Sequence, residues 1–118
     1  MLFRLKVLED SVDSDTRSLQ ARGATPELTR EEAARTAADL EAGAVVRFYR
    51  GGPPHGRVIT ARATDDGIWL KLRFRTRDAD IWRLVETGAV NTIEVQTFDS
   101  GVDVFMKSVA ATYPSVVG

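Results

Sequence analysis

Apolar and polar residues alternate most clearly between Gly56 and Phe98, a stretch that predicts a strand, a turn, a strand, a helix and another strand. The second of these strands has an apolar face made of Ile68, Leu70, Leu72 and Phe74 and an opposite face made of Trp69, Lys71, Arg73 and Arg75. A period of two places the first set on a core and the second toward solvent or a partner. Asp65-Asp66-Gly67 supplies the turn before it, because Asp-Gly tolerates the positive φ of a tight hairpin.

The helix after this strand is expected to begin at Thr76 or Asp78, either of which can cap it. Its predicted apolar stripe consists of Ile81, Leu84 and Val85. Gly88 stands where a helix ends in the left-handed conformation. Alternation then predicts a strand over Thr92–Phe98, a short loop at Asp99-Ser100-Gly101, and a final strand over Val102–Thr112.

The first half of the chain predicts two more strands and one helix. Leu2–Leu8 alternates as a strand, whereas Glu9–Gly23 is polar and without a period, which favours a mobile loop with a short strand around Ser18–Ala21. Thr29 and Glu32 form a capping box, so a helix with a largely alanine inner face should run from there to Gly43. Ala44–Tyr49 then reads as a strand, and the Gly-Gly-Pro-Pro run at 51–54 breaks regular structure.

Composition limits the classes of function. A chain of 118 residues suits a single domain. The net charge of -1 argues against a nucleic-acid partner, and no apolar run is long enough to span a bilayer, which argues against a membrane. The absence of cysteine removes thiolate catalysis, and no histidine pair or calcium-loop spacing indicates a metal or other cofactor site.

Two features carry candidate chemistry. The single histidine, His55, lies in a Gly/Pro-rich loop, where an imidazole can act as a general base, although a structural role is the more common one. The basic strand can bind phosphates through Lys71, Arg73 and Arg75 with Trp69 as a stacking surface, or it can form a solvated or protein-binding face. With a net charge near zero, the solvated or protein-binding reading is favoured.

The order of these elements resembles the prohead (capsid maturation) protease family of tailed bacteriophages. The pieces that carry the resemblance are Val45–Arg50, Gly56-Arg57-Val58, Asp65–Leu70, the helix over Ile81–Gly88, Gly88-Ala89-Val90, Thr92–Phe98 and the closing strand Val104–Pro114. In that family a histidine ends the strand before Gly-Arg-Val, and a serine nucleophile lies in the strand after the helix. The resemblance covers the chain from about Thr29 onward.

This chain departs from the family at both catalytic positions. Glu94 stands at the position of the serine, with Thr92 and Gln96 in place of the flanking glycines. The family histidine falls near Arg50, and His55 comes a few residues later. Acyl transfer needs a hydroxyl or thiol beside a base, so the resemblance implies a degenerate site near Glu94, Arg50 and His55 and no catalytic residue.

The sequence therefore predicts an α+β domain over residues 1–118: a bent, mainly antiparallel sheet or partly closed β-barrel with two packed helices, similar to the prohead proteases. Residues 1–24 are expected to form a strand plus a mobile polar loop, and residues 25–118 the protease-like core. The predicted function is that of a noncatalytic phage virion or capsid-assembly protein, located in the virion and assembled in the host cytoplasm. Its partners would be capsid or other virion proteins bound through Trp69, Lys71, Arg73 and Arg75, with homo-oligomerisation left open. The alternatives are an active capsid maturation serine protease and a small nucleic-acid-binding β-barrel.

Overall fold

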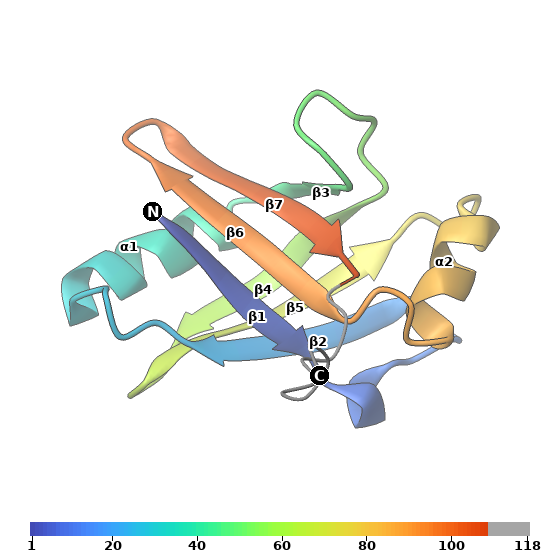
Figure 1. Cartoon of the computed structure of the whole chain (residues 1–118), viewed down its shortest axis with the longest axis horizontal. Coiled ribbons are helices and arrows are strands. Elements are labelled where there is room, and N and C mark those ends of the chain that lie inside the picture. The colour runs from blue at the N-terminus through green and yellow to red at the C-terminus, as the bar shows by residue number, and fades with distance from the viewer. Residues whose placement is uncertain (109–118) are drawn as a thin grey trace, which may run out of the picture.

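Strands with apolar inner faces close into a barrel in the computed structural model, which describes residues 1–108 (Figure 1). In this part of the chain the strands are β1 (Leu2–Val7), β2 (Ser18–Ala24), β3 (Val45–Arg47), β4 (Gly56–Ala63), β5 (Gly67–Phe74), β6 (Thr92–Phe98) and β7 (Gly101–Lys107). The helices are α1 (Arg30–Glu41), α2 (Ala79–Glu86) and a short 3-10 helix, η1 (Glu9–Ser11).

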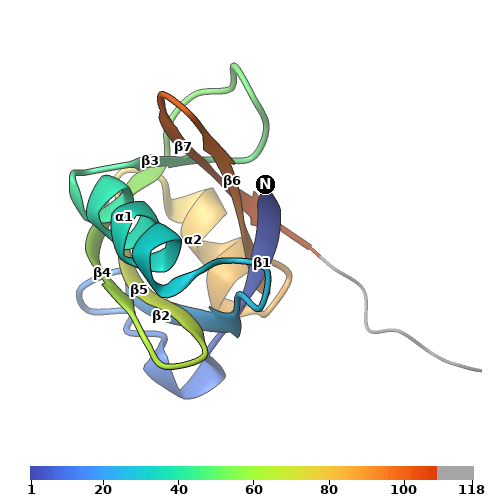
Figure 2. The ribbon, with the colours of Figure 1, turned by 90° about the vertical axis from the view of Figure 1, so that its left-hand side faces the viewer.

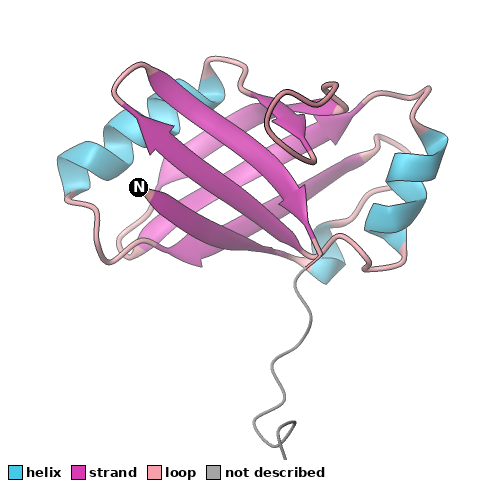
Figure 3. Cartoon of the chain, turned by 45° about the horizontal axis from the view of Figure 1, so that its top comes forward, coloured by secondary structure: helices cyan, strands magenta, loops and turns pink. Residues whose placement is uncertain are grey.

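The strands follow one another around the barrel in the order β1-β2-β5-β4-β3-β7-β6, and β6 returns to β1. Neighbouring strands are antiparallel except β3 and β7, which pair in parallel through Val46 and Val104. The expected α+β fold with a bent, mainly antiparallel sheet and two helices is confirmed, and the barrel is fully closed. Figure 3 shows that α1 and α2 lie at opposite ends of the barrel.

Strand β5 provides the centre of the core because β2 and β4 pair with it on its two sides. Ile68, Leu70, Leu72 and Phe74 are all buried. A bulge at Ile59 in β4 shifts the register against β5, so that Val58 and Ala61 both face inward. The faces predicted from the alternation in β5 are therefore confirmed.

The short strand expected around Ser18–Ala21, inside the polar stretch Glu9–Gly23, is present and extends further than expected. Strand β2 runs from Ser18 to Ala24, pairs with both β1 and β5, and buries Leu19 and Ala21 completely. The small residues of β2 explain why its alternation of apolar and polar residues is weak and why it can pack closely against β1. A Cβ atom at Gly23 would lie 2.7 Å from the carbonyl oxygen of Arg4, so glycine is what allows β2 to approach β1.

Helix α1 begins with the predicted capping box: Thr29 Oγ1 accepts from the Glu32 N–H at 3.1 Å, and the Thr29 N–H donates to Glu32 Oε1 at 3.0 Å. The helix is followed by Gly43 at a φ of 107°, as expected. Its buried face consists of Ala33, Thr36, Ala37 and Leu40, whereas Ala34 is exposed. Figure 2 shows α1 in front of the ring of strands, beside β4, where Glu41 accepts a hydrogen bond from the Ala61 N–H at 3.2 Å.

Helix α2 follows Asp78, whose side chain makes no capping hydrogen bond. The predicted stripe is wrong at Leu84, which is 40% exposed, while Trp82 and Val85 are buried. The Trp82 ring packs against Phe74 with 5.7 Å between ring centroids. The large indole thus occupies the core position of this short helix, and the helix turns Leu84 outward.

Strand β3 is shorter than predicted, because it covers Val45–Arg47 instead of 44–49. Strand β7 covers Gly101–Lys107 and begins at Gly101 instead of Val102, while residues 109–112 of the expected last strand lie outside the described residues. Gly88, at a φ of 80°, ends the α2 segment as predicted. Among the described residues, neither helix has the length and apolar character needed to cross a bilayer.

Candidate functional site

The three residues predicted to mark a degenerate catalytic site each contact a different partner. Glu94 faces outward from β6 and accepts a hydrogen bond from Arg4 Nε at 3.2 Å. The Arg50 guanidinium lies 3.5 Å from an Asp103 carboxylate oxygen and 4.9 Å from the centroid of the Phe98 ring. His55 lies next to Asp78 instead. Within residues 1–108, no hydrogen bond or ion pair joins Glu94, Arg50 and His55 to one another.

The surroundings of Glu94 are unsuited to acyl transfer. On the outside of the barrel, Glu94 lies in register between Arg4 of β1 and Phe105 of β7, and Phe105 is only 6% exposed. The Lys107 ammonium lies 5.6 Å from the Phe105 ring centroid. The Arg4 guanidinium thus pairs with the carboxylate on the β1 side, and on the β7 side the register partner of Glu94 is a buried phenylalanine. The Glu94 side chain is therefore paired with a cation and offers no hydroxyl or thiol for acyl transfer.

His55 is fixed in place by its backbone. Its N–H donates to the Val46 carbonyl at 2.9 Å, and its carbonyl accepts from the Arg75 N–H at 3.0 Å, so this residue connects β3 to the segment after β5. The imidazole packs edge-on against Phe48, with 5.4 Å between ring centroids. The side chain of His55 therefore enters a semi-buried cluster between the β3–β4 loop and α2.

Three buried polar atoms in this region have no hydrogen-bond partner among the described residues: His55 Nδ1, Asp78 Oδ2 and Trp82 Nε1. Nδ1 and Oδ2 lie 3.6 Å apart, slightly too far for a hydrogen bond. We call His55, Asp78 and Trp82 the His–Asp cluster. The Asp78 carboxylate therefore faces Nδ1 of the imidazole, and Nε2 is neither hydrogen-bonded nor fully buried. A histidine that acts as a general base is oriented in this way.

Sequence reasoning missed this cluster. The sequence indicated Asp78 only as a helix cap, gave no signal for Trp82, and showed no carboxylate close to His55. The i, i+4 spacing of Asp78 and Trp82 places them on one face of α2 and was available from the sequence. The proximity of Asp78 to His55 was not, because it depends on how β4 and β5 return the chain to α2.

The outer face of β5 presents Trp69, Lys71 and Arg73 as predicted, and Arg75 is exposed just beyond the end of the strand. The Trp69 indole N–H donates to Gln20 Oε1 of β2 at 2.9 Å. Neighbouring strands contribute further cations to the same surface. We call this surface the basic wall, and define it by Lys6, Arg22, Arg57, Arg62, Lys71 and Arg73.

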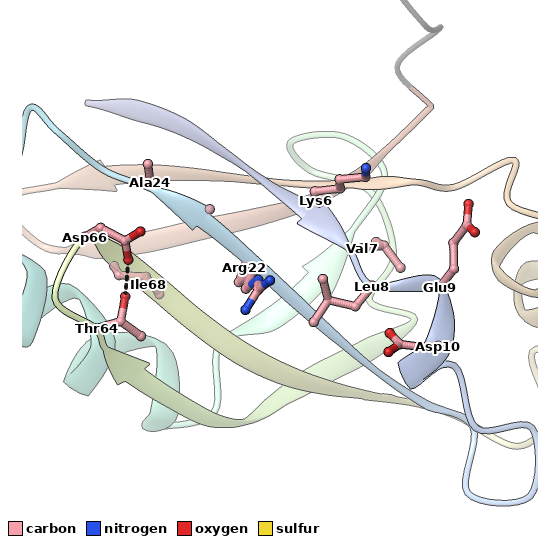
Figure 4. Close-up of a pocket in the computed structure, with 11 residues that line it drawn as sticks. Lys6, Val7, Leu8, Glu9, Asp10, Arg22, Ala24, Thr64, Asp66 and Ile68 are labelled. Atoms are coloured by element: carbon pink, nitrogen blue, oxygen red, sulfur yellow. Dashed lines mark hydrogen bonds between the residues drawn. The ribbon is translucent and has the colours of Figure 1, made fainter.

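A groove of about 810 Å³ adjoins the basic wall where β1 and β2 diverge (Figure 4). Lys6 and Arg22 lie along it, and Glu9, Asp10 and Asp66 line its edges. A second groove, of about 690 Å³, lies on the other side of β1 beside the end of α2. Cations therefore occupy the middle of the first groove, with carboxylates at its rim.

Residues 1–108 contain no group of three histidine, aspartate or glutamate side chains placed to hold a metal ion. Comparison with known proteins adds no assignment, since no family model, curated protein or solved structure matches the chain.

Proposed function

We propose that the chain is a noncatalytic structural protein of a tailed-phage virion or of capsid assembly, built on a prohead protease-like barrel and bound to other virion proteins. The observation that carries this proposal is the state of Glu94. The residue at the nucleophile position is a carboxylate that accepts a hydrogen bond from Arg4 at 3.2 Å, and the nearby Arg50 is engaged with Asp103. Where the resemblance implies a catalytic site, the chain carries two separate surface ion pairs, Arg4–Glu94 and Arg50–Asp103.

The closed, bent barrel with two helices agrees with the coarse fold that the resemblance implies. The exposed apolar residues Met1, Leu2 and Phe98 also support a protein-binding role. Leu2 of β1 lies opposite Gln96 of β6, which makes Leu2 a diagonal neighbour of Phe98 on the outer face. Apolar side chains that gather on one surface favour a protein partner, either a capsid protein or a second copy of this chain.

Two measurements test the proposal. Quantitative mass spectrometry of mature particles should find the chain in a fixed, stoichiometric amount, whereas a maturation protease is normally lost. A serine-reactive fluorophosphonate probe should leave the purified protein unlabelled. Absence of the chain from mature particles would overturn the structural assignment.

An active hydrolase is the second candidate, and the His–Asp cluster is the observation that favours it. A carboxylate beside His55 provides the orienting group that the sequence did not reveal. The cluster still lacks a nucleophile, because no hydroxyl among residues 1–108 is hydrogen-bonded to the imidazole. Probe labelling that disappears in His55→Gln and persists in the exposed-site control Asp80→Asn would establish this alternative and remove the noncatalytic one.

A further inference from the structure

Charge is strongly segregated on this barrel although the chain as a whole is nearly neutral. The contiguous strands β1, β2, β5 and β4 contain no aspartate or glutamate, and they carry all six cations of the basic wall. The acidic residues lie in loops, in helices and in β6 and β7. A net charge of -1 therefore conceals a half-barrel on which every charged residue of the strands is a cation.

The strand register places like charges directly opposite each other. Lys6 pairs with Arg22 across β1 and β2, and Arg57 pairs with Arg73 across β4 and β5. Like charges at directly opposed positions destabilise a sheet. None of the six cations of the basic wall forms an ion pair with a described residue, and the acidic neighbour of Lys71 is Asp13, whose pKa is lowered by hydrogen bonds from Thr16 and, to a smaller extent, by the charge of Lys71. The free protein thus carries a repulsion that a bound polyanion would relieve.

Trp69 lies in the middle of these cations. The strand register places it between Arg22 on β2 and Arg62 on β4, with Lys6 beyond Arg22. The hydrogen bond to Gln20 restricts the rotation of the indole, and the side chain remains partly exposed. Proteins that bind single-stranded nucleic acids combine an aromatic ring with surrounding cations. The bases stack on the ring, and the phosphates contact the cations.

We propose that the basic wall binds single-stranded nucleic acid, with a base against Trp69 and the backbone crossing β1, β2, β5 and β4. Outward residues repeat about every 6.6 Å along a strand, and neighbouring strands lie about 4.8 Å apart. The cations are therefore spread over an area across which several phosphates can bind. In duplex DNA the faces of the bases are stacked inside the helix and cannot contact Trp69, whereas a single strand exposes them. The net charge of -1 does not prevent this surface from attracting phosphates, because binding depends on local charge.

The test uses the whole chain and a fluorescein-labelled oligothymidylate of about 16 nucleotides, a length within the range of single-strand site sizes. Anisotropy titrations at about 50 and 200 mM salt give the affinity and its salt slope. The test variant combines Arg22→Gln, Lys71→Gln and Arg73→Gln. The control combines Arg30→Gln, Arg35→Gln and Arg83→Gln, which changes the net charge equally on exposed helix positions.

We expect the wall variant to lose at least ten-fold in affinity and the control to bind like the parent. Each lost phosphate contact should lower the magnitude of the salt slope by about 0.7, which gives about 2 for three contacts. Oligothymidylate should also quench the fluorescence of Trp69, while the buried Trp82 serves as an internal reference, and Trp69→Phe should abolish that quenching. Circular dichroism checks that each variant is folded.

Equal losses in the wall variant and the control would overturn the proposal, as would an absence of binding to the parent. Tighter binding to a duplex of the same length would overturn the single-stranded assignment. Binding of the wall to anionic phospholipid vesicles without binding to oligothymidylate would assign the surface to a membrane instead. None of these outcomes bears on whether the chain is a component of phage particles, which the particle stoichiometry decides separately.

Discussion

Nδ1 of His55 lies 3.6 Å from Oδ2 of Asp78, and both atoms are buried without a hydrogen bond. The two residues belong to the β3–β4 loop and to the start of α2, so this contact is where the loop meets the helix. Leaving two buried polar atoms unpaired is costly, and each such pair in a folded protein calls for a physical explanation. A small inward movement would bring Nδ1 and Oδ2 within hydrogen-bond distance and link the loop to the helix.

A double-mutant cycle measures this link. We expect Asp78→Asn and His55→Gln to show an interaction free energy of about 1 kcal/mol in chemical denaturation, as contacting residues do. Asp80→Asn makes the same change of charge at an exposed position of the first helical turn, and should not couple to His55→Gln. Additivity of the two test mutations within about 0.3 kcal/mol would show that the residues are adjacent without interacting.

Truncation of the core of β5 should be costly. Leu72 is completely buried between β2 and β4, so Leu72→Ala is expected to lower the free energy of unfolding by about 2–5 kcal/mol. Arg73→Ala, one residue along on the outer face, should change it by less than about 0.5 kcal/mol. Urea denaturation of both variants checks the assignment of faces, and a Leu72→Ala protein as stable as the parent would contradict it.

Gly67 should not tolerate a side chain. A Cβ atom there would collide with the backbone of Gly23 and Ala24 on β2, which can yield only if the strands separate. We expect Gly67→Ala to destabilise the protein by about 3 kcal/mol, the upper end for overpacking. Asp65→Ala in the same turn, at an exposed position, is the control and should be close to neutral. Thermal melting distinguishes the two, and equal melting temperatures would refute the close packing.

The capping box predicts a pH dependence of stability. The backbone N–H and the side chain of Thr29 lower the pKa of Glu32 below its ordinary value of 4.5, so folding favours the ionised carboxylate. Because the folded-state pKa is the lower one, this contribution is complete above pH 4.5 and is lost as the pH falls through the lowered value.

Melting temperatures measured from above pH 4.5 to below it should show this loss in the parent, and less of it in Glu32→Gln. Glu31→Gln is the matched control, because the neighbouring Glu31 takes no part in the capping box and should keep the pH dependence of the parent. Identical pH profiles for the two variants would mean that Glu32 does not carry the effect.

The sequence revealed those parts of the fold that depend on local spacing. The alternation of Ile68, Leu70 and Leu72 identified β5 and its faces, and the Thr29–Glu32 spacing located the start of α1. Strand β2 was expected only over Ser18–Ala21 because Leu19 is its only large inward residue. Its full length and its burial depend on β1 and β5, which pair with it from distant parts of the chain.

The candidate sites show the same division. The exposure of Trp69, Lys71 and Arg73 followed from their period of two, but the opposition of Arg57 and Arg73 depends on the register across the β4–β5 hairpin and its bulge. The approach of His55 to Asp78 could not be predicted, since no local pattern relates a loop to a helix two strands later. Sequence spacing therefore located individual side chains, and only the closed barrel determined which of them meet.

The β6–β7 hairpin closes the barrel on both sides, by pairing antiparallel with β1 and in parallel with β3. During synthesis, the five preceding strands emerge from the ribosome first and present two free edges until residues 92–107 arrive. The pairing of Phe3 with Val95 spans most of the chain, so ring closure requires contacts of high sequence separation. Barrels dominated by such contacts fold in about milliseconds to seconds. Until the ring closes, the newly made chain exposes unpaired strand edges through which two copies could associate.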